Sequence, residues 1–248
     1  MFYAGLVSVS FRKLSPEEIV RVAVAAGLKY IEWGSDVHAP YTEQDRLQEI
    51  KQLQTDYGVR CCSYGTYFRL GITPMEELSG YIRAAKLLGT NILRLWAGNQ
   101  SPWLLSEEEK HALVAQCCEA AKLAEEEEVI LCLECHRNTY TETKEAAREL
   151  MEEVNSPAFI MYWQPHSTRT QEENIEYTRM LREYTTHIHT FYWKGSEKYS
   201  LAAGIEEWRT YLREFSGNHK ALLEFMPDGK IESLCYETEI LREIINGV

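Results

Sequence analysis

The sequence predicts an α/β protein built as a single (β/α)8 barrel over residues 1–248. Three observations lead to this prediction. Short β-branched or aromatic runs alternate eight times with longer segments of helical period, which is the pattern of βα units repeated around a parallel sheet. No long linker or low-complexity insert interrupts them, and a barrel of this kind usually needs about 250 residues. The content of 45% hydrophobic and 26% charged residues is that of an ordinary globular chain.

The expected strands are the eight short apolar runs. They cover Tyr3–Val9, Tyr30–Trp33, Arg60–Tyr64, Ile92–Trp96, Val129–Glu134, Phe159–Trp163, His187–Phe191 and Ala221–Phe225. We expect the helices between them to begin near Pro16, Glu43, Pro74, Ser106, Glu142, Gln171, Ile205 and Ile231. Two of these starts carry capping residues, since Ser15 precedes a proline and two acids, and Ser106 precedes three glutamates.

An open doubly wound sheet is the alternative to a closed barrel. The first strand-to-helix turn, Ser8–Phe11, lacks the glycine-rich fingerprint of dinucleotide-binding sheets, and no GxxxxGK[ST] phosphate loop occurs in the chain. These absences favour the barrel and weigh against nicotinamide and ATP chemistry.

Charge and cysteine content exclude some classes of partner. The formal net charge of −12 disfavours nucleic acids and anionic membrane surfaces, because these are polyanions. The seven cysteines are odd in number and form no paired CxxC array, so we interpret most of them as small buried apolar residues in a reducing compartment. We see neither a signal-like N-terminus nor an apolar run of about 20 residues, and we therefore expect a cytoplasmic protein.

Reactive groups gather where the predicted strands end, which is where barrel enzymes carry their active sites. Five of the seven histidines fall there: His38, His136, His166, His187 and His189. Glu134 and Glu224 end otherwise apolar strands, and charged residues in such places usually have an ionic partner or a metal. Either glutamate alone fits a structural ion pair equally well. Together with His189 they suggest a divalent metal held by oxygen and nitrogen ligands.

Aromatic and cationic side chains accompany this cluster. Tryptophans recur at the same strand ends, at Trp33, Trp96, Trp163 and Trp193. They suit stacking against sugar C–H faces, and packing at the barrel rim is the other interpretation. The nearest cations are Arg94, Lys194 and Lys198. They could bind a phosphate or carboxylate, or they could neutralise Glu134 and Asp36.

At these residues the chain resembles the xylose isomerase-like barrel superfamily, the sugar phosphate isomerase/epimerase group. The segments that carry the resemblance are Gly27–Trp33, Leu131–Glu134, His187–His189 and Leu222–Glu224. The resemblance implies one divalent ion (Mn, Mg, Co or Zn) bound through Glu, Asp, His and Glu from strands five to eight. Glu134, His189 and Glu224 match three of these positions.

The fourth ligand position departs from the family. Gln164, in Trp163-Gln164-Pro165-His166, stands where the family has aspartate. The ligand set then carries a charge of −2 instead of −3, so we expect the metal to bind more weakly. His166 is the alternative ligand.

The resemblance implies a metal-dependent isomerase or epimerase of a small sugar, keto-sugar or cyclitol that acts through an enediolate. Glu134 and Glu224 are then the base and the acid. The expected substrate contacts are Trp33, His38, Arg94, Trp96, His136, His166, Trp193 and Lys194. Two alternatives stay open: a dehydratase of a cyclic polyol or hydroxy acid, since Glu134–Thr141 resembles that branch, and a carbohydrate-binding barrel without turnover. The loop aromatics also fit a homodimer.

Overall fold

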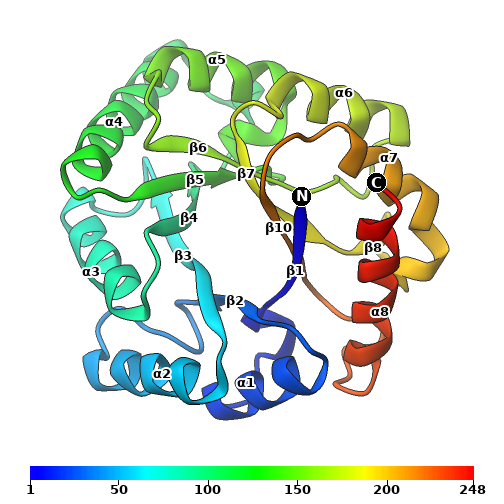
Figure 1. Cartoon of the computed structure of the whole chain (residues 1–248). Coiled ribbons are helices and arrows are strands. Elements are labelled where there is room, and N and C mark those ends of the chain that lie inside the picture. The colour runs from blue at the N-terminus through cyan, green and yellow to red at the C-terminus, as the bar shows by residue number, and fades with distance from the viewer.

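The computed structural model describes residues 1–248 and shows a closed parallel barrel surrounded by helices (Figure 1). The barrel strands are β1 (Phe2–Val7), β2 (Tyr30–Gly34), β3 (Arg60–Leu70), β4 (Ile92–Ala97), β5 (Ile130–Glu134), β6 (Phe159–Trp163), β7 (Thr185–Thr190) and β10 (His219–Leu223). Their spatial order is β1-β10-β7-β6-β5-β4-β3-β2, and each neighbouring pair is parallel. The predicted (β/α)8 barrel is confirmed.

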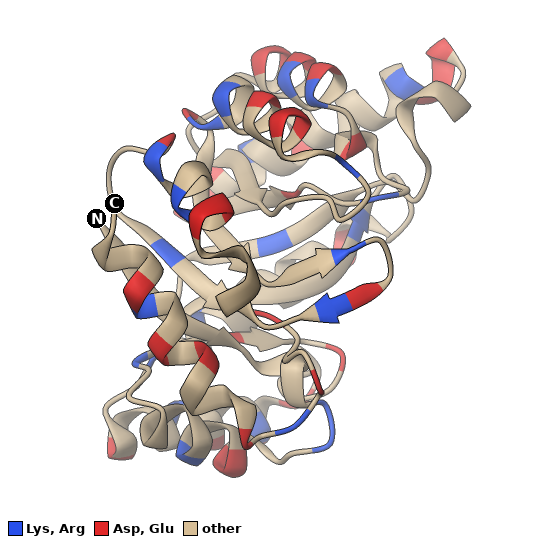
Figure 2. Ribbon diagram, turned by 90° about the vertical axis from the view of Figure 1, so that its right-hand side faces the viewer, with Lys and Arg blue, Asp and Glu red and all other residues tan.

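Eight helices form the outer ring. They are α1 (Pro16–Ala25), α2 (Gln44–Tyr57), α3 (Leu78–Leu88), α4 (Glu107–Glu126), α5 (Lys144–Val154), α6 (Gln171–Leu181), α7 (Ile205–Arg213) and α8 (Ser233–Asn246). Acidic and basic residues lie along these outer helices (Figure 2). The predicted N-cap Ser15 and the predicted capping box at Ser106 are both present, and each serine exchanges side-chain and backbone hydrogen bonds with the glutamate three residues on. No helix is long and apolar enough to span a bilayer.

Three strands have C-terminal ends that differ from the prediction by two residues or more. The first strand ends at Val7, because Ser8–Phe11 turns into a 3-10 helix. The last ends at Leu223, so Glu224 and Phe225 lie just beyond it. β3 continues six residues past Tyr64, and its register against β4 shifts between Gly65 and Arg69. This irregularity lets one strand keep pairing while it bends over the rim of the barrel.

A short antiparallel hairpin, β8 (Tyr192–Lys194) and β9 (Glu197–Tyr199), was not predicted. It follows β7 directly, and the Gly195 N–H donates to the Ser167 carbonyl oxygen, which docks the hairpin on the loop after β6. The hairpin therefore belongs to the same end of the barrel as the strand termini described next.

The side chains in the middle of the barrel are partly polar. Most of the apolar core lies between the strands and the helices, in one cluster of 59 buried residues. Inside the ring of strands, buried polar residues sit on five different strands: Glu32, Ser63, Arg94, Glu134 and His189. Buried charges of this kind require partners, and these residues supply partners to one another.

Candidate active site

The centre of the site is a connected set of buried charges. Arg94 donates from Nε to Glu32 Oε1 at 3.0 Å and from Nη1 to Glu134 Oε2 at 2.5 Å. His189 Nε2 lies 3.3 Å from Glu32 Oε2, and Ser63 Oγ donates to the same carboxylate oxygen at 2.7 Å. Arg94 therefore neutralises Glu134, one of the two roles that the sequence left open. Its other partner is Glu32 instead of Asp36, which pairs with Arg12.

Three oxygen donors converge on the other nitrogen of His189. Nδ1 lies 3.3 Å from Gln164 Oε1, 3.5 Å from Glu224 Oε2 and 3.7 Å from Glu134 Oε1. Gln164 is held in this orientation because its Nε2 donates to the Cys135 carbonyl oxygen at 3.1 Å. The structure thus brings together all four residues that were predicted to bind a metal.

These four side chains fit a divalent cation. With metal–ligand bonds of about 2.0–2.2 Å, two ligands of a tetrahedral site lie about 3.3–3.6 Å apart, close to the separations around Nδ1. No group of three or more His, Cys, Asp or Glu side chains forms a metal site as the side chains lie in this structure. The oxygen nearest to Nδ1 is the amide oxygen of Gln164.

Glu32 orients the histidine toward this set. A carboxylate that accepts the proton of one imidazole nitrogen leaves the other nitrogen available for a metal, a recurrent arrangement in metalloproteins. Glu32 Oε2 stands in this position relative to His189 Nε2. In the sequence, Glu32 is an acid near the end of the apolar run Tyr30–Gly34, a position that indicates affinity for a cation but not a partner for His189.

Burial and neighbouring charges separate the pKa values of these groups. Burial alone would raise the pKa of Glu134, but the positive charges of Arg94 and His189 hold it well below its usual range. The pKa of Glu32 is also lowered in spite of burial, because the positive charges of His189 and Arg94 lie next to its carboxylate. Burial raises the pKa of Glu224 to about 7. Burial would lower the pKa of His189, but the charges of Glu224 and Glu32 raise it to about 10.

Glu224 differs from Glu134 in its contacts. No protein group donates a hydrogen bond to the Glu224 carboxylate, which reaches only His189 Nδ1. The next residue, Phe225, has φ of +57°, an uncommon left-handed conformation for a bulky side chain. The Phe225 N–H donates to Ser10 Oγ at 3.0 Å, which supports the sharp turn of the backbone after Glu224.

A cavity of about 550 Å³ opens beside Gln164, whereas Glu134, His189 and Glu224 do not line it. Gln164 lines it together with three of the predicted substrate contacts, His136, His166 and Trp193. The Nε2 atom of His166 and the Nε1 atom of Trp193 are buried without a hydrogen-bond partner, so both can bind a ligand. The lining contains Arg137 but no aspartate or glutamate.

The other predicted substrate contacts lie elsewhere or are already engaged. Trp33 is fully buried outside the barrel and donates to Gln54 Oε1 on α2 at 3.2 Å. Both ring nitrogens of buried His38 have partners, Ser8 Oγ and the Leu14 carbonyl oxygen. Lys194 is about half exposed on the hairpin and pairs with Glu207 at 2.8 Å.

Strand alternation explains the tryptophans. Successive side chains of a strand point to opposite faces, so with Glu32 and Tyr162 inside the barrel, Trp33 and Trp163 face the helices. Trp163 packs against Trp208 with ring centroids 6.0 Å apart. For these two, the packing interpretation holds, whereas Trp96 and Trp193 lie at the mouth of the barrel.

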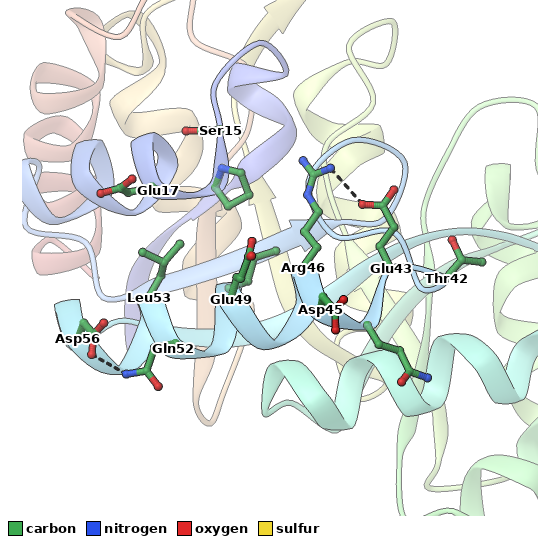
Figure 3. Close-up of a pocket in the computed structure, with 13 residues that line it drawn as sticks. Ser15, Glu17, Thr42, Glu43, Asp45, Arg46, Glu49, Gln52, Leu53 and Asp56 are labelled. Carbon is green, nitrogen blue, oxygen red and sulfur yellow. Dashed lines mark hydrogen bonds and ion pairs between the residues drawn. The ribbon is translucent and has the colours of Figure 1, made fainter.

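A larger hollow lies away from this site. It has about 1130 Å³ and opens on the outer surface between α1 and α2 (Figure 3). Glu17, Glu43, Asp45, Glu49 and Asp56 line it, and Arg46 there pairs with Glu43 at 3.4 Å. It contains no histidine and no strand residue. The barrel mouth is therefore the better candidate for chemistry.

Comparison with known proteins agrees with this architecture. A family model described as xylose isomerase-like TIM barrel matches residues 20–200. A curated relative, the 3-dehydroshikimate dehydratase of Bacillus anthracis, is 24% identical over 206 residues, which cover 75% of this chain and 70% of the relative.

Solved structures share the fold over the full length. The crystal structure of the probable 3-DHS dehydratase from Bacillus anthracis superposes with a TM-score of 0.79 at 21% identity, covering 98% of this chain and 99% of that one. The D-allulose 3-epimerase from Methylomonas sp. gives a TM-score of 0.72 at 16% identity, covering 100% and 98%. With its closed barrel and the family match over most of its length, the chain belongs to the xylose isomerase-like TIM barrel family.

Proposed function

We propose that this protein is a divalent-metal-dependent enzyme that removes a proton from the carbon next to a carbonyl group of a small, carbohydrate-like substrate. The observation that carries the proposal is the convergence of Glu134, Gln164 and Glu224 on His189 Nδ1, at 3.3–3.7 Å. When bound there, a divalent cation supplies positive charge that stabilises the negative charge developing on substrate oxygens.

Glu224 is the proposed base. In the metal-free protein its carboxylate accepts no hydrogen bond and burial raises its pKa to about 7, so of the two glutamates it is the one whose oxygens are free to take up a proton. Glu134 is bound by Arg94, which keeps it ionised and suits it better to holding a cation. His136 and His166 line the adjoining cavity and are proposed contacts for substrate hydroxyl groups.

We propose isomerisation or epimerisation of a small sugar, keto-sugar or cyclitol as the first candidate reaction. Several structural neighbours are sugar epimerases, which supports it. Inversion at one carbon needs a base on one face of the substrate and a proton donor on the opposite face, whereas transfer between adjacent carbons on one face needs a single carboxylate. Glu134 accepts a hydrogen bond from Arg94, so Glu224 is the one glutamate free to carry a proton. The site therefore suits proton transfer between adjacent carbons on one face better than inversion.

A dehydratase is the second candidate, and two observations favour it. The curated sequence relative is a 3-dehydroshikimate dehydratase, and the Glu134–Thr141 segment resembles that branch of the family. Elimination of water uses the same proton abstraction. The proton then leaves with a hydroxyl group of the neighbouring carbon instead of returning to the substrate.

Proton NMR in D2O tests both candidates. The metal-loaded protein is incubated with D-allulose, L-ribulose and 3-dehydroshikimate. An isomerase or epimerase should place deuterium on the carbon that receives the returning proton, whereas a dehydratase should lose the proton beside the carbonyl as the product forms. A second sugar identifies an isomerase or epimerase, and a conjugated product that absorbs in the ultraviolet identifies a dehydratase.

Glu224→Gln should abolish this exchange without loss of stability, while Glu49→Gln on the exposed face of α2 serves as the matched control. Exchange at the wild-type rate in the Glu224→Gln protein would refute the assignment of the base.

A further inference from the structure

Arg69 forms no direct ion pair with a carboxylate, although the charge of Glu134 acts on it at longer range. Its guanidinium is half-buried at the end of β3, and its single hydrogen bond runs from Nη1 to the Gly98 carbonyl oxygen at 2.9 Å. A guanidinium has five N–H donors, so most of those of Arg69 are free. Arg94, on the neighbouring strand β4, is by contrast bound by two carboxylates.

The fold holds this guanidinium on a fixed surface. The extension of β3 pairs Arg69 with Trp96 of β4, and the guanidinium carbon lies 4.4 Å from the centre of the Trp96 ring. Stacking on an indole restrains the planar fork of an arginine and leaves its edge open for hydrogen bonding. The Trp96 Nε1 atom is itself buried without a partner.

The position joins the candidate active site. Trp96 also lies next to His136, with ring centroids 5.8 Å apart, and His136 lines the cavity beside Gln164. That cavity has no acidic lining residue. A positive region here is unexpected from composition, because the whole chain carries a net charge of −12. The cations available to an anionic ligand here are Arg69 and Arg137, which lines the cavity.

We propose that Arg69, stacked on Trp96, is a subsite for an anionic group of the substrate, a carboxylate or a phosphate. The proposal rests on the proposed function, because it assigns a substrate class to the same site. The fork of a guanidinium matches two oxygens of either group. The substrate is then an acidic hydroxy-carbonyl compound or a sugar phosphate, and a neutral sugar lacks the group that Arg69 recognises.

Binding of two small anions tests the subsite without knowledge of the substrate. Inorganic phosphate and acetate are titrated into the protein, and the side-chain Nε–H resonance of Arg69 is followed by 1H–15N NMR. We expect a saturable shift of this resonance. Arg69→Met should weaken the binding of the preferred anion by roughly tenfold or more, and Arg69→Lys, which keeps the charge but loses the fork, should fall between.

The matched control is Arg83→Met, which removes the same charge from an exposed arginine on α3 and should leave anion affinity unchanged. Tighter binding of phosphate points to a sugar phosphate, and tighter binding of acetate points to a carboxylic acid. Absence of saturable binding, or equal affinity of the wild type and Arg69→Met, would overturn the proposal.

Kinetics separate this proposal from the proposed function. For an anionic substrate, Arg69→Met should raise KM and leave kcat near the wild-type value. Efficient exchange of a neutral ketose with an unchanged KM in Arg69→Met would sink the subsite and leave the proposed chemistry standing. Anion binding that depends on Arg69, together with no exchange of any acidic or neutral substrate, would do the reverse.

Discussion

Replacing Arg94 with methionine tests whether the buried charge network stabilises the fold. Arg94 lies inside the barrel, 2% exposed, and donates to Glu32 at 3.0 Å and to Glu134 at 2.5 Å. Methionine fills most of the same space without a charge. It leaves two buried carboxylates that share only the positive charge of His189.

The expected loss of stability is large. Removing one partner of a buried ion pair typically costs about 3–5 kcal/mol, because the remaining charge stays desolvated. Arg12→Met is the matched control, since Arg12 pairs with Asp36 on the surface and is about half exposed. An exposed pair of this kind contributes about 0–1 kcal/mol. The two variants remove the same charge, so their difference isolates the effect of burial.

The pH dependence has a defined sign. Arg94 helps to hold the pKa values of Glu32 and Glu134 below the usual 4.5. A carboxylate with a lowered pKa in the folded state contributes stability above its unfolded pKa and loses this contribution as the pH falls. The difference between the wild type and Arg94→Met should therefore be greatest at neutral pH and should shrink below about pH 4.5.

Urea unfolding followed by circular dichroism measures these free energies, with EDTA present so that bound metal does not contribute. Three outcomes would refute the reasoning. They are a loss below about 1 kcal/mol, a loss equal to that of Arg12→Met, or a difference that grows as the pH falls.

Three further predictions follow from the same structure. Gln164→Asp should raise Mn2+ affinity about tenfold or more, because a third carboxylate joins the ligand set; isothermal titration measures it, and unchanged affinity contradicts the ligand assignment. The metal-free protein should lose stability as the pH rises from about 7 toward 10, because the charge that His189 keeps up to a pKa of about 10 is lost there; thermal unfolding of wild type and His189→Gln tests this, and equal slopes contradict it. Gly204→Ala should cost about 1–3 kcal/mol, since its Cβ would meet the Tyr192 ring at 2.4 Å; urea unfolding measures the loss, and an unchanged free energy of unfolding would argue against the clash.

Local patterns predicted most of the fold. The alternation of apolar runs and helical segments placed all eight barrel strands, and Ser15 and Ser106 marked two helix starts correctly. These features depend on residues near one another in the chain. The hairpin after β7 was missed, because Tyr192–Tyr199 pairs over so few residues that no periodicity shows.

The candidate metal ligands were also visible in the sequence, because a charged residue that ends an apolar strand is rare enough to be noticed alone. Glu134 and Glu224 are of this kind, and the structure places both next to His189. The sequence could not predict that Glu134 has a hydrogen-bond donor and Glu224 has none. Arg94 donates to Glu134 because the register of β4 and β5 places the two residues close together.

By itself, the sequence determined the barrel, its order of elements and the residues that meet at one end of it, since periodicity and strand position follow from local chemistry. The tertiary structure alone decided which side chains face inward and which contact one another. Trp33 packs against a helix while Glu32 enters the barrel, and Arg69 reaches Trp96 through an irregular register. The physical reason is that strand closure sets direction and register together, and both depend on residues far apart in the chain.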